Sequence, residues 1–331
     1  MRGQLMKSFT KEQHLEVLGY YSDNQIAAKK YASISKGLVK VSPQNVAYWR
    51  KIFLSHKGVT ARADNAMKNQ RKLRKPEPDD DIGKLPDLNK VYHRVLIIPD
   101  QHVPYHHPDM LAFLAWVKAS FKPDLVVNMG DEVDNHALSF HDSDPNLDSA
   151  GKELERSLPT LKALAKLFPN QLVCASNHGS LVYRKAKAHG LPVQYIKSYR
   201  QILFPEGGGN GWSWQYEWIV RVPKAGAEYG EVLFKHQSTN ATADAAHNRV
   251  DGLCVGHNHG RFEVAYAASR DFLYWGGTFG CLIDKDALAY AYGKETKNKP
   301  IIGCGILLEG LPMMIPMQLD SGGRWIGGNN V

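Results

Sequence analysis

Apolar residues in the first part of the chain recur with the period of an α-helix. Within 11–21 and 24–34 they return every three or four positions, and a third such stretch begins at Ser42-Pro43. This spacing collects apolar side chains on one helical face, and a serine followed by proline is a favourable helix start. We expect three short helices, which make residues 1–58 a small all-helical domain.

The apolar pattern changes beyond residue 90. Apolar runs of strand length alternate with helical patterns, an order typical of a parallel sheet flanked by helices. After about residue 212, strand-like runs follow one another without intervening helices. The predicted fold class is therefore α/β. In chain order the predicted elements are strand 95–99, helix 108–119, strand 125–129, helix 151–167, strand 172–175, and strands 216–222, 232–234, 252–255, 262–280 and 301–308.

Residues 59–90 connect these two patterns and follow neither. The segment loses apolar periodicity and passes from the basic run 71–75 to the acidic, proline-containing run 76–81. Such composition is typical of a linker. We therefore expect a helical module over 1–58, a linker over 59–90 and a second domain over 91–331.

The net charge of +8 is concentrated at one end of the chain. Residues 1–75 carry 16 Lys and Arg against 4 Asp and Glu, whereas the other 256 residues carry 25 against 29. A basic excess of this kind favours an anionic partner such as nucleic acid. The two parts of the chain are therefore expected to have different partners.

The third predicted helix resembles the recognition helix of helix-turn-helix domains over SPQNVAYWRK, residues 42–51, although the turn before it is long for that family. The alternative is a helical bundle docked on the second domain, with its lysines facing water. Both interpretations remain open on the sequence. The candidate nucleic-acid-binding residues are Lys40, Gln44, Asn45, Arg50, Lys51, Arg71, Lys72, Arg74 and Lys75.

Composition narrows the class of protein. Hydrophobic residues make up 43% and charged residues 22%, as in ordinary globular proteins. No apolar run approaches the roughly 20 residues that a membrane helix needs, and no apolar stretch follows the N-terminal charges as in a secretory signal. Four singly placed cysteines indicate buried free thiols rather than a zinc site. The expected setting is the cytoplasm, with no membrane partner.

Candidate metal ligands stand at the ends of five predicted strands. Ligand sites in open α/β sheets lie at such carboxyl ends, and imidazole together with carboxylate oxygen suits Mn, Fe or Zn. In chain order the groups are Asp100-Gln-His102, Gly130-Asp131-Glu-Val-Asp134, Ser176-Asn177-His178-Gly179, Lys235-His236-Gln237 and Gly256-His257-Asn258-His259.

The order Asp-x-His, Gly-Asp-x-x-Asp, Asn-His, His, Gly-His-x-His resembles the calcineurin-like metallophosphoesterases. That superfamily includes phosphatases, cyclic-nucleotide diesterases and Mre11-like nucleases, and the resemblance covers roughly residues 93–310. It implies a four-layer αββα sandwich and two divalent metal ions. Manganese is the metal favoured, with Fe, Zn, Ni and Mg as alternatives.

The resemblance also implies a role for each motif residue. Asp131 is expected to bridge the two ions. His178 resembles the family's general acid, which protonates the leaving oxygen, and Asp134 is expected to orient its imidazole. The implied ligands are Asp100, His102, Asp131 and His259 for one ion and Asp131, Asn177, His236 and His257 for the other.

Three departures from the family pattern bear on function. Asn135 stands where the protein serine/threonine phosphatases carry an arginine that clamps phosphate, which disfavours a protein-phosphatase role. Ser176 and Gly179 flank the Asn-His pair where the family usually has glycine and an acid, without removing a ligand. His236 lacks the glycine that often follows it, so His247 is the alternative ligand.

Further histidines and aromatics have a functional and a structural interpretation. His106, His107 and His136 follow motif residues and are candidates for contact with substrate phosphate. Tryptophans and a tyrosine at period two in 207–218 predict an aromatic strand face, which is either core packing or a platform for unpaired bases. These residues are Trp212, Trp214, Tyr216 and Trp218.

The function that the sequence favours is metal-dependent hydrolysis of phosphoesters in nucleic acid, by a phosphodiesterase, a nuclease or an end phosphatase. A small-molecule phosphatase is the first alternative, and a nucleic-acid-binding regulator with a structural metal site is the second. A DNA-binding-like module joined to this catalytic pattern resembles phosphoesterases encoded by bacteriophages, which favours a cytoplasmic setting. The oligomeric state is left open.

Overall fold

The computed structural model describes residues 8–53, 81–140, 144, 146–270, 272–287 and 299–327. The chain divides into two compact units, Met1–Lys75 and Pro76–Val331. None of the described helices is long and apolar enough to cross a membrane. All four cysteines are buried free thiols, as expected from their isolated positions.

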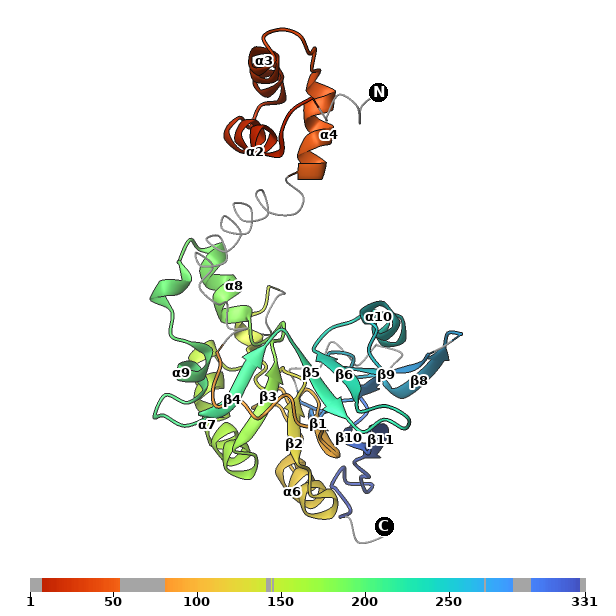
Figure 1. The fold of residues 1–331 in the computed structure, drawn as a ribbon. Helices are drawn as coiled ribbons and strands as arrows, with labels where there is room; N and C mark the ends of the chain where they lie inside the picture. The colour runs from red at the N-terminus through yellow and green to blue at the C-terminus, as the bar shows by residue number, and fades with distance from the viewer. Residues whose placement is uncertain are drawn as a thin grey trace. The chain divides into compact units, whose positions relative to one another are not determined.

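Unit 1 contains the three predicted helices, α2 (Lys11–Tyr20), α3 (Asn24–Ile34) and α4 (Pro43–Phe53) (Figure 1). Polar side chains fix their first turns. Thr10 and Gln13 form a reciprocal capping box at α2, and the Asp23 carboxylate accepts the first amides of α3. Such caps satisfy amides that have no partner inside the helix and contribute about 1 kcal/mol each.

The three helices pack around one aromatic cluster. Tyr31 and Trp49 are fully buried in it, and their rings meet edge to face at 5.1 Å. Arg50 ties the helices together, because its guanidinium donates to Asn24 Oδ1 and to the carbonyls of Leu18 and Tyr21. This guanidinium therefore has a structural role within the unit.

Unit 2 is built on two mixed sheets (Figure 1). The first has the order β11-β10-β1-β2-β3-β4, with β1 to β4 parallel, and the second has the order β5-β6-β7-β9-β8, with β6, β7 and β9 parallel. The strands are β1 (Arg94–Ile98), β2 (Leu125–Asn128), β3 (Asn170–Cys174), β4 (Gly211–Gln215), β5 (Glu217–Val222), β6 (Gly230–Lys235), β7 (Gly252–Val255), β8 (Phe262–Ala268), β9 (Leu273–Phe279), β10 (Gly303–Leu308) and β11 (Leu311–Pro316).

Helices cover both outer faces of the paired sheets, so unit 2 is an αββα sandwich (Figure 1). The predicted helices at 108–119 and 151–167 are present as α6 and α7. The expectation of no helix after residue 212 is wrong, because α10 lies between β6 and β7. The helices are α6 (Met110–Phe121), α7 (Ala150–Leu167), α8 (Leu181–Ala188), α9 (Tyr199–Leu203) and α10 (Ala241–Asn248), with 3-10 turns η2 (His136–Leu138) and η3 (Val193–Tyr195).

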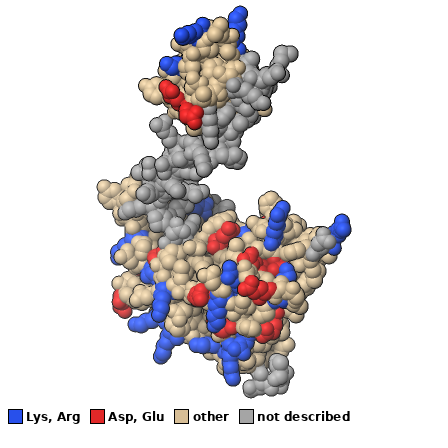
Figure 2. All heavy atoms as spheres, in the orientation of Figure 1, with Lys and Arg blue, Asp and Glu red and all other residues tan. Residues whose placement is uncertain are grey.

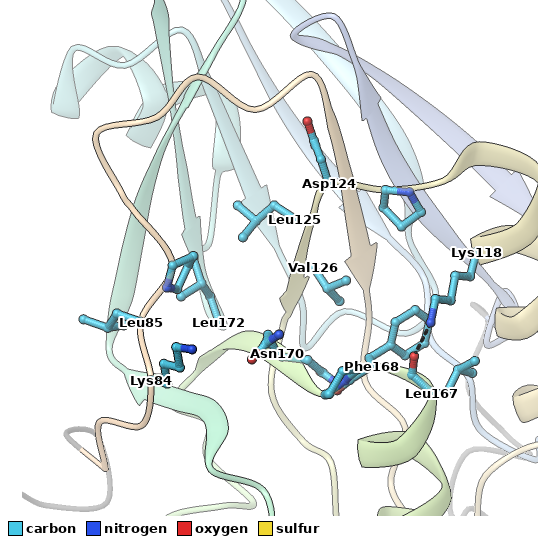
Figure 3. A pocket seen from close by; sticks show the side chains of 14 residues that line it. Lys84, Leu85, Lys118, Asp124, Leu125, Val126, Leu167, Phe168, Asn170 and Leu172 are labelled. Atoms are coloured by element: carbon cyan, nitrogen blue, oxygen red, sulfur yellow. Dashed lines mark hydrogen bonds between the residues drawn. The ribbon is translucent and has the colours of Figure 1, made fainter.

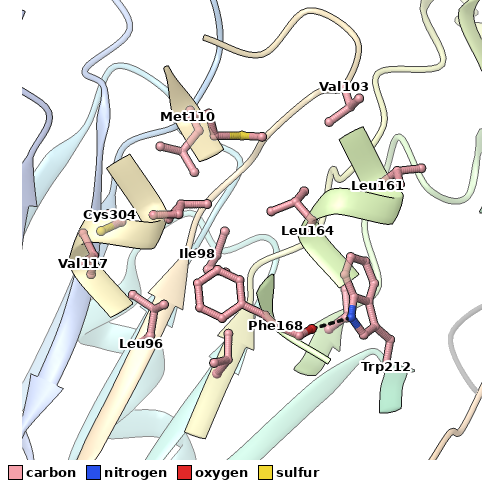
Figure 4. Packing of buried hydrophobic residues seen from close by; sticks show 14 of the residues in the cluster. Leu96, Ile98, Val103, Met110, Val117, Leu161, Leu164, Phe168, Trp212 and Cys304 are labelled. Carbon is pink, nitrogen blue, oxygen red and sulfur yellow. Dashed lines mark hydrogen bonds between the residues drawn. The ribbon is translucent and has the colours of Figure 1, made fainter. Parts of the chain in front are cut away.

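Alternation along β1 explains why unit 2 has four layers. Leu96 and Ile98 face α6 and α7 (Figure 4). Val95 and Ile97 face the second sheet, and all four residues are fully buried. A strand that is buried on both faces has a continuous run of apolar residues in its sequence. A third cluster, around Leu253, packs the second sheet against α10.

The aromatic stretch of 207–218 belongs to the core. Trp212, Trp214 and Trp218 are buried, and each indole N–H donates a hydrogen bond within the fold. The Trp212 indole donates to Phe168 O at 2.9 Å (Figure 4). Tyr216 is exposed but lies between β4 and β5. The base-stacking interpretation is therefore wrong for the three tryptophans, because they are buried in the core.

The predicted linker, 59–90, lies outside the described residues up to residue 80. From residue 81 onward the chain packs on unit 2. Asp81 forms a salt bridge with Arg200 at 3.0 Å, and its carbonyl accepts the Trp214 amide. The Lys84 amide donates to Asn210 O at 2.8 Å. This segment therefore covers the open edge of β4.

Candidate metal centre

The five predicted groups stand on loops that follow the carboxyl ends of strands in both sheets. The loops after β1, β2 and β3 come from the first sheet, and those after β6 and β7 from the second. Because parallel strands end at one edge, the two sheets bring these loops together. The structure gathers the imidazole and carboxylate side chains into three overlapping triads, which are Asp100-His102-His259, His102-Asp131-His178 and Asp131-His236-His257.

The backbone of these loops is unusual. His102, Asp131 and His257 all have positive φ, between 49° and 65°, which is uncommon for residues other than glycine and accumulates at functional sites. Gly256 makes room for the cluster, since a side chain there would approach Asp100 Oδ1 to 2.6 Å. The tight turns direct several side chains toward one point.

The first part of the cluster contains Asp100, His102 and His259. Asp100 is fully buried, and its Oδ2 lies 3.1 Å from His259 Nε2. The Nε2 atoms of His102 and His259 also lie 3.1 Å apart. Three ligand atoms thus face one small volume.

The second part contains Asn177, His236 and the exposed His257. His236 Nε2 lies 2.7 Å from Asn177 Oδ1 and 3.2 Å from Asp131 Oδ2. The same Asp131 oxygen lies 3.5 Å from His102 Nε2 in the first part. The Asp131 carboxylate therefore stands between the two parts, the position of a bridging ligand.

Hydrogen bonds on the far side fix which nitrogen of each imidazole faces inward. His102 Nδ1 donates to Asp134 Oδ1 at 2.5 Å, and His236 Nδ1 donates to Met129 O at 2.7 Å. Such partners leave the Nε2 lone pair available to a metal, as is usual for ligating histidines. Both Nε2 atoms point toward Asp131.

The donor set fits a pair of divalent cations. Asp100 Oδ1 is buried, and among the described residues no hydrogen-bond donor reaches it. His236 Nε2 faces the Asn177 carbonyl oxygen, and two acceptors at hydrogen-bond distance repel one another unless a proton or cation lies between them. Imidazole nitrogens with carboxylate and amide oxygens suit first-row metals. The buried triads are consistent with a dinuclear site.

Charges within the cluster shift its titration. Burial alone would lower the pKa of His236, but the carboxylates of Asp131 and Asp100 outweigh it and raise that pKa to about 9. Burial alone would raise the pKa of Asp131, but His236 and His178 hold it well below its usual range. A proton on the His236 imidazole thus supplies the positive charge that these carboxylates require.

His178 lies beside the cluster. Its Nδ1 donates to the backbone carbonyl of Asp134, and its amide donates to Asp131 Oδ1 at 3.1 Å. Burial opposes the charged imidazole, but Asp131 and Asp134 outweigh it and raise its pKa. The Asp134 carboxylate lies 3.7 Å from His178 Nδ1 and contacts His102 more closely. Asn135 Nδ2 donates to His178 O at 3.0 Å, which ties two loops together.

A buried polar stripe on α7 supports the same loops and was not found in the sequence. Glu153 accepts the amides of His136 and Ala137 at 3.0 and 3.3 Å, and Ser157 donates to Val103 O at 3.1 Å. Burial, together with the Asp134 carboxylate, raises the pKa of Glu153 to about 7. The signal was its spacing, since Glu153 and Ser157 share a helical face with Leu161.

The remaining candidates take different positions. Gln237, which the sequence did not single out, donates to Asn177 Oδ1 at 3.2 Å. His107 is buried and bonds Gly323 O, whereas His106 lies near Thr160. The alternative ligand His247 is exposed on α10 and belongs to no triad of the described residues.

The nucleic-acid-binding candidates are described only in part. Lys40 and Gln44 are exposed, whereas the backbone amide of Asn45 donates to the capping Ser42 Oγ at 3.2 Å and the Arg50 guanidinium is engaged inside unit 1. The side chain of Lys51 lies outside the described residues. So do the four residues of the basic run, Arg71, Lys72, Arg74 and Lys75.

A cavity of about 330 Å³ lies at the opposite ends of the strands (Figure 3). Its lining includes the first residues of β2 and β3, Leu125 and Asn170. Lys118 Nζ donates to Leu167 O at 2.6 Å beside it (Figure 3). Since the metal-ligand candidates follow the carboxyl ends of the strands, this cavity is separate from the cluster.

No family model and no curated protein matches the sequence. Vps29 from Chaetomium thermophilum aligns over 71% of this chain and 93% of its own, at 14% identity and a TM-score of 0.37. YfcE, a phosphoesterase from E. coli, aligns over 71% and 97%, at 12% identity and 0.31. A metallophosphoesterase from Sphaerobacter thermophilus aligns over 65% and 83%, at 15% identity and 0.31. The likeness concerns the fold and assigns neither residues nor activity.

Proposed function

We propose that this protein hydrolyses phosphoesters with two divalent cations held at the cluster. The observation that carries the proposal is the position of Asp131, whose carboxylate lies between the imidazoles of His102 and His236. A shared carboxylate is what brings two cations to the ~4 Å separation of two-metal hydrolases. The ligands assigned are Asp100, His102, Asp131 and His259 for one ion and Asp131, Asn177, His236 and His257 for the other.

When bound, such a pair of cations lowers the pKa of a water molecule and neutralises charge on the phosphoryl oxygens. His178 is assigned as the proton donor to the leaving oxygen. The carboxylates of Asp131 and Asp134 outweigh burial and raise the pKa of His178, which favours the protonated ring, and the bond from Nδ1 to the Asp134 carbonyl leaves Nε2 to deliver the proton. Asp134 acts through two contacts, its carboxylate on His102 and its carbonyl on His178.

Nucleic acid is the proposed substrate. Support comes from the basic excess of residues 1–75, 16 Lys and Arg against 4 Asp and Glu. On α2 to α4, Figure 2 shows Lys and Arg side chains at the surface with fewer Asp and Glu. Because phosphates dominate nucleic-acid affinity, this unit is proposed to bring the polynucleotide to the hydrolase, through Lys40 and the polar face of α4 that carries Gln44.

A screen of metals against substrates tests the proposal. The purified chain, stripped with EDTA and reloaded with Mn, Fe, Zn, Ni or Mg, is given bis(p-nitrophenyl) phosphate, p-nitrophenyl phosphate, single- and double-stranded oligonucleotides and 5′- and 3′-phosphorylated ends. We expect metal-restored turnover of diesters and oligonucleotides, best with Mn. Turnover of small phosphoesters alone would replace nucleic acid by a small-molecule substrate. Loss of all turnover with every metal would refute the hydrolase.

A further inference from the structure

The chain between β3 and β4 carries Asn177 and His178 near its start and has an unusual charge. Residues 175–205 contain five Lys and Arg and no Asp or Glu. Most of this segment forms α8, η3 and α9. The rest of unit 2 mixes both signs, so this stretch is a local basic region attached directly to the proposed proton donor.

An exposed aromatic side chain lies against the basic helix of this region. The Phe140 ring has Arg184 Cζ at 5.0 Å and Lys185 Nζ at 4.5 Å from its centroid, yet 52% of Phe140 remains exposed. Tyr195, in η3 beside α8, is 82% exposed. Two cations and one accessible ring therefore share one surface, and a second exposed ring lies on the neighbouring turn η3.

The cations of this surface have no acidic partner among the residues that the structure describes. Neither Arg184 nor Lys185 forms a salt bridge there. The carboxylates that follow Phe140 in the described chain are engaged elsewhere, because Asp144 accepts from Asn146 and Asp148 pairs with Arg156. Two adjacent cations on one ring repel each other, so an anion between them would be stabilising.

Two short stretches of chain connect this surface to the metal centre. Helix α8 begins three residues after His178, and Phe140 follows Asp134 by six residues through η2. Asn135 Nδ2 joins the two loops by its bond to His178 O at 3.0 Å. The segments that carry Phe140 and Arg184 therefore both lead away from the metal centre, and η2 contacts α8.

We propose that Phe140, Arg184, Lys185 and Tyr195 bind a single strand of nucleic acid beside the metal centre. The guanidinium and ammonium groups take successive phosphates, and the two rings stack on unpaired bases. Basic side chains interleaved with exposed aromatics are the chemistry by which proteins hold single strands. The inference rests on the proposed function and assigns its substrate class, because a paired base has no face to offer Phe140.

Binding of a fluorescent 12-nucleotide single strand to the full chain tests the basic pair. EDTA prevents cleavage, and affinity is measured from low to moderate salt. In Arg184→Ala/Lys185→Ala we expect about ten-fold weaker binding at low salt, with a logarithmic salt dependence shallower by roughly 1.4 for two lost phosphate contacts. Lys162→Ala/Lys166→Ala, on α7, is the matched control and should bind like the parent. Circular dichroism verifies folding.

Substitution of Phe140 tests the stacking. Phe140→Ala should weaken single-strand binding between about five-fold and about 150-fold, the range for a lost base stack, with an unchanged salt slope. Phe140→Trp should retain binding, which separates stacking from a loss of fold. The assignment would be contradicted if Phe140→Ala and Phe140→Trp bound the single strand with equal affinity. It would also be contradicted if the parent bound duplex as tightly as single strand.

A second readout separates this inference from the proposed function. With Mn present, bis(p-nitrophenyl) phosphate is too small to span the surface, so Arg184→Ala/Lys185→Ala should hydrolyse it like the parent and lose kcat/KM only on the oligonucleotide. Parent-like oligonucleotide binding and cleavage in that variant would overturn the surface while the hydrolase stands. Absent turnover of every phosphodiester would refute the hydrolase, and the EDTA binding series would still decide whether the surface exists.

Discussion

Two groups of buried histidines in this chain have opposite surroundings. In unit 1, His14 is enclosed by aromatic rings, and its Nδ1 lies 2.8 Å from the Tyr31 hydroxyl. In unit 2, His102 and His236 are equally buried, but each directs Nε2 toward another nitrogen or an acceptor oxygen. The first has a hydroxyl partner that can donate or accept, whereas the second group brings together acceptor atoms that a proton or a cation must separate.

The difference teaches how burial of a polar group indicates function. A buried histidine that meets a complementary partner is a structural residue, because the fold itself compensates its desolvation. A cluster of acceptors that face one another is costly unless a ligand completes it, and no donor in the described parts of the chain reaches the buried Asp100 Oδ1. By this criterion His14 is a structural residue of unit 1, and the proposed chemistry belongs to unit 2.

Asp131→Asn gives the sharpest test of the bridging position. The amide removes the charge that both proposed cations share, so turnover of bis(p-nitrophenyl) phosphate with Mn should fall by at least about 10⁴-fold, several kcal/mol of charge stabilisation. Metal analysis should show less than two ions per chain. Glu263→Gln, on the exposed face of β8, is the control. Full occupancy together with parent-like turnover would remove the basis of the proposal.

His178→Ala separates the proton donor from the ligands. The proposed role predicts a loss of about 10²–10³-fold in kcat, within the range for general acid catalysis, with two metal ions retained. A substrate whose leaving group needs no proton should lose less. Loss of a metal ion in this variant would instead make His178 a ligand, in line with its place in one of the triads.

Glu153→Gln tests the support behind the centre. One amide of η2 would face the new NH₂ group, so we expect about ten-fold weaker Mn binding by calorimetry and a loss of roughly 1–3 kcal/mol in the free energy of unfolding. Glu155→Gln, exposed on the same helix, should change neither. If Glu153→Gln bound Mn with parent affinity, the α7 stripe would have no influence on the centre.

His14→Ala should have the smallest effect on turnover. The cavity and the lost contact to Tyr31 should destabilise unit 1 by about 2–4 kcal/mol, whereas hydrolysis of bis(p-nitrophenyl) phosphate should stay within about two-fold of the parent. Circular dichroism on heating follows the first effect, and the diester assay follows the second. A large loss of diester turnover would mean that the two groups of histidines are not independent.

Much of the fold was predictable from local pattern. The helices of unit 1 and the strands that precede Asp100, Asp131 and Asn177 follow from apolar period and length. The order of the motifs identified the ligand candidates. The convergence of the loops was not predictable from spacing, because it depends on how two sheets pair. Figure 1 shows how the two sheets pair, with α10 connecting β6 to β7 of the second sheet.

Residues whose role depends on backbone contacts were not predicted from the sequence. Glu153 accepts amides of a loop that precedes it by 16 or 17 positions, and no motif marks such a contact. For the tryptophans of 207–218, a functional interpretation was offered for residues that are structural. A period of two indicates a strand face but does not say whether that face is covered. Arg50 was predicted to bind nucleic acid, but its guanidinium donates to backbone carbonyls within unit 1.

The position of Asp131 can be tested directly by diffraction from crystals grown with manganese, with anomalous data collected at the manganese edge. Two anomalous peaks about 3.5–4 Å apart, both within coordinating distance of the Asp131 carboxylate, are the result that a dinuclear centre requires. Featureless density between His102 and His236, or one peak that leaves Asp131 unligated, would contradict it.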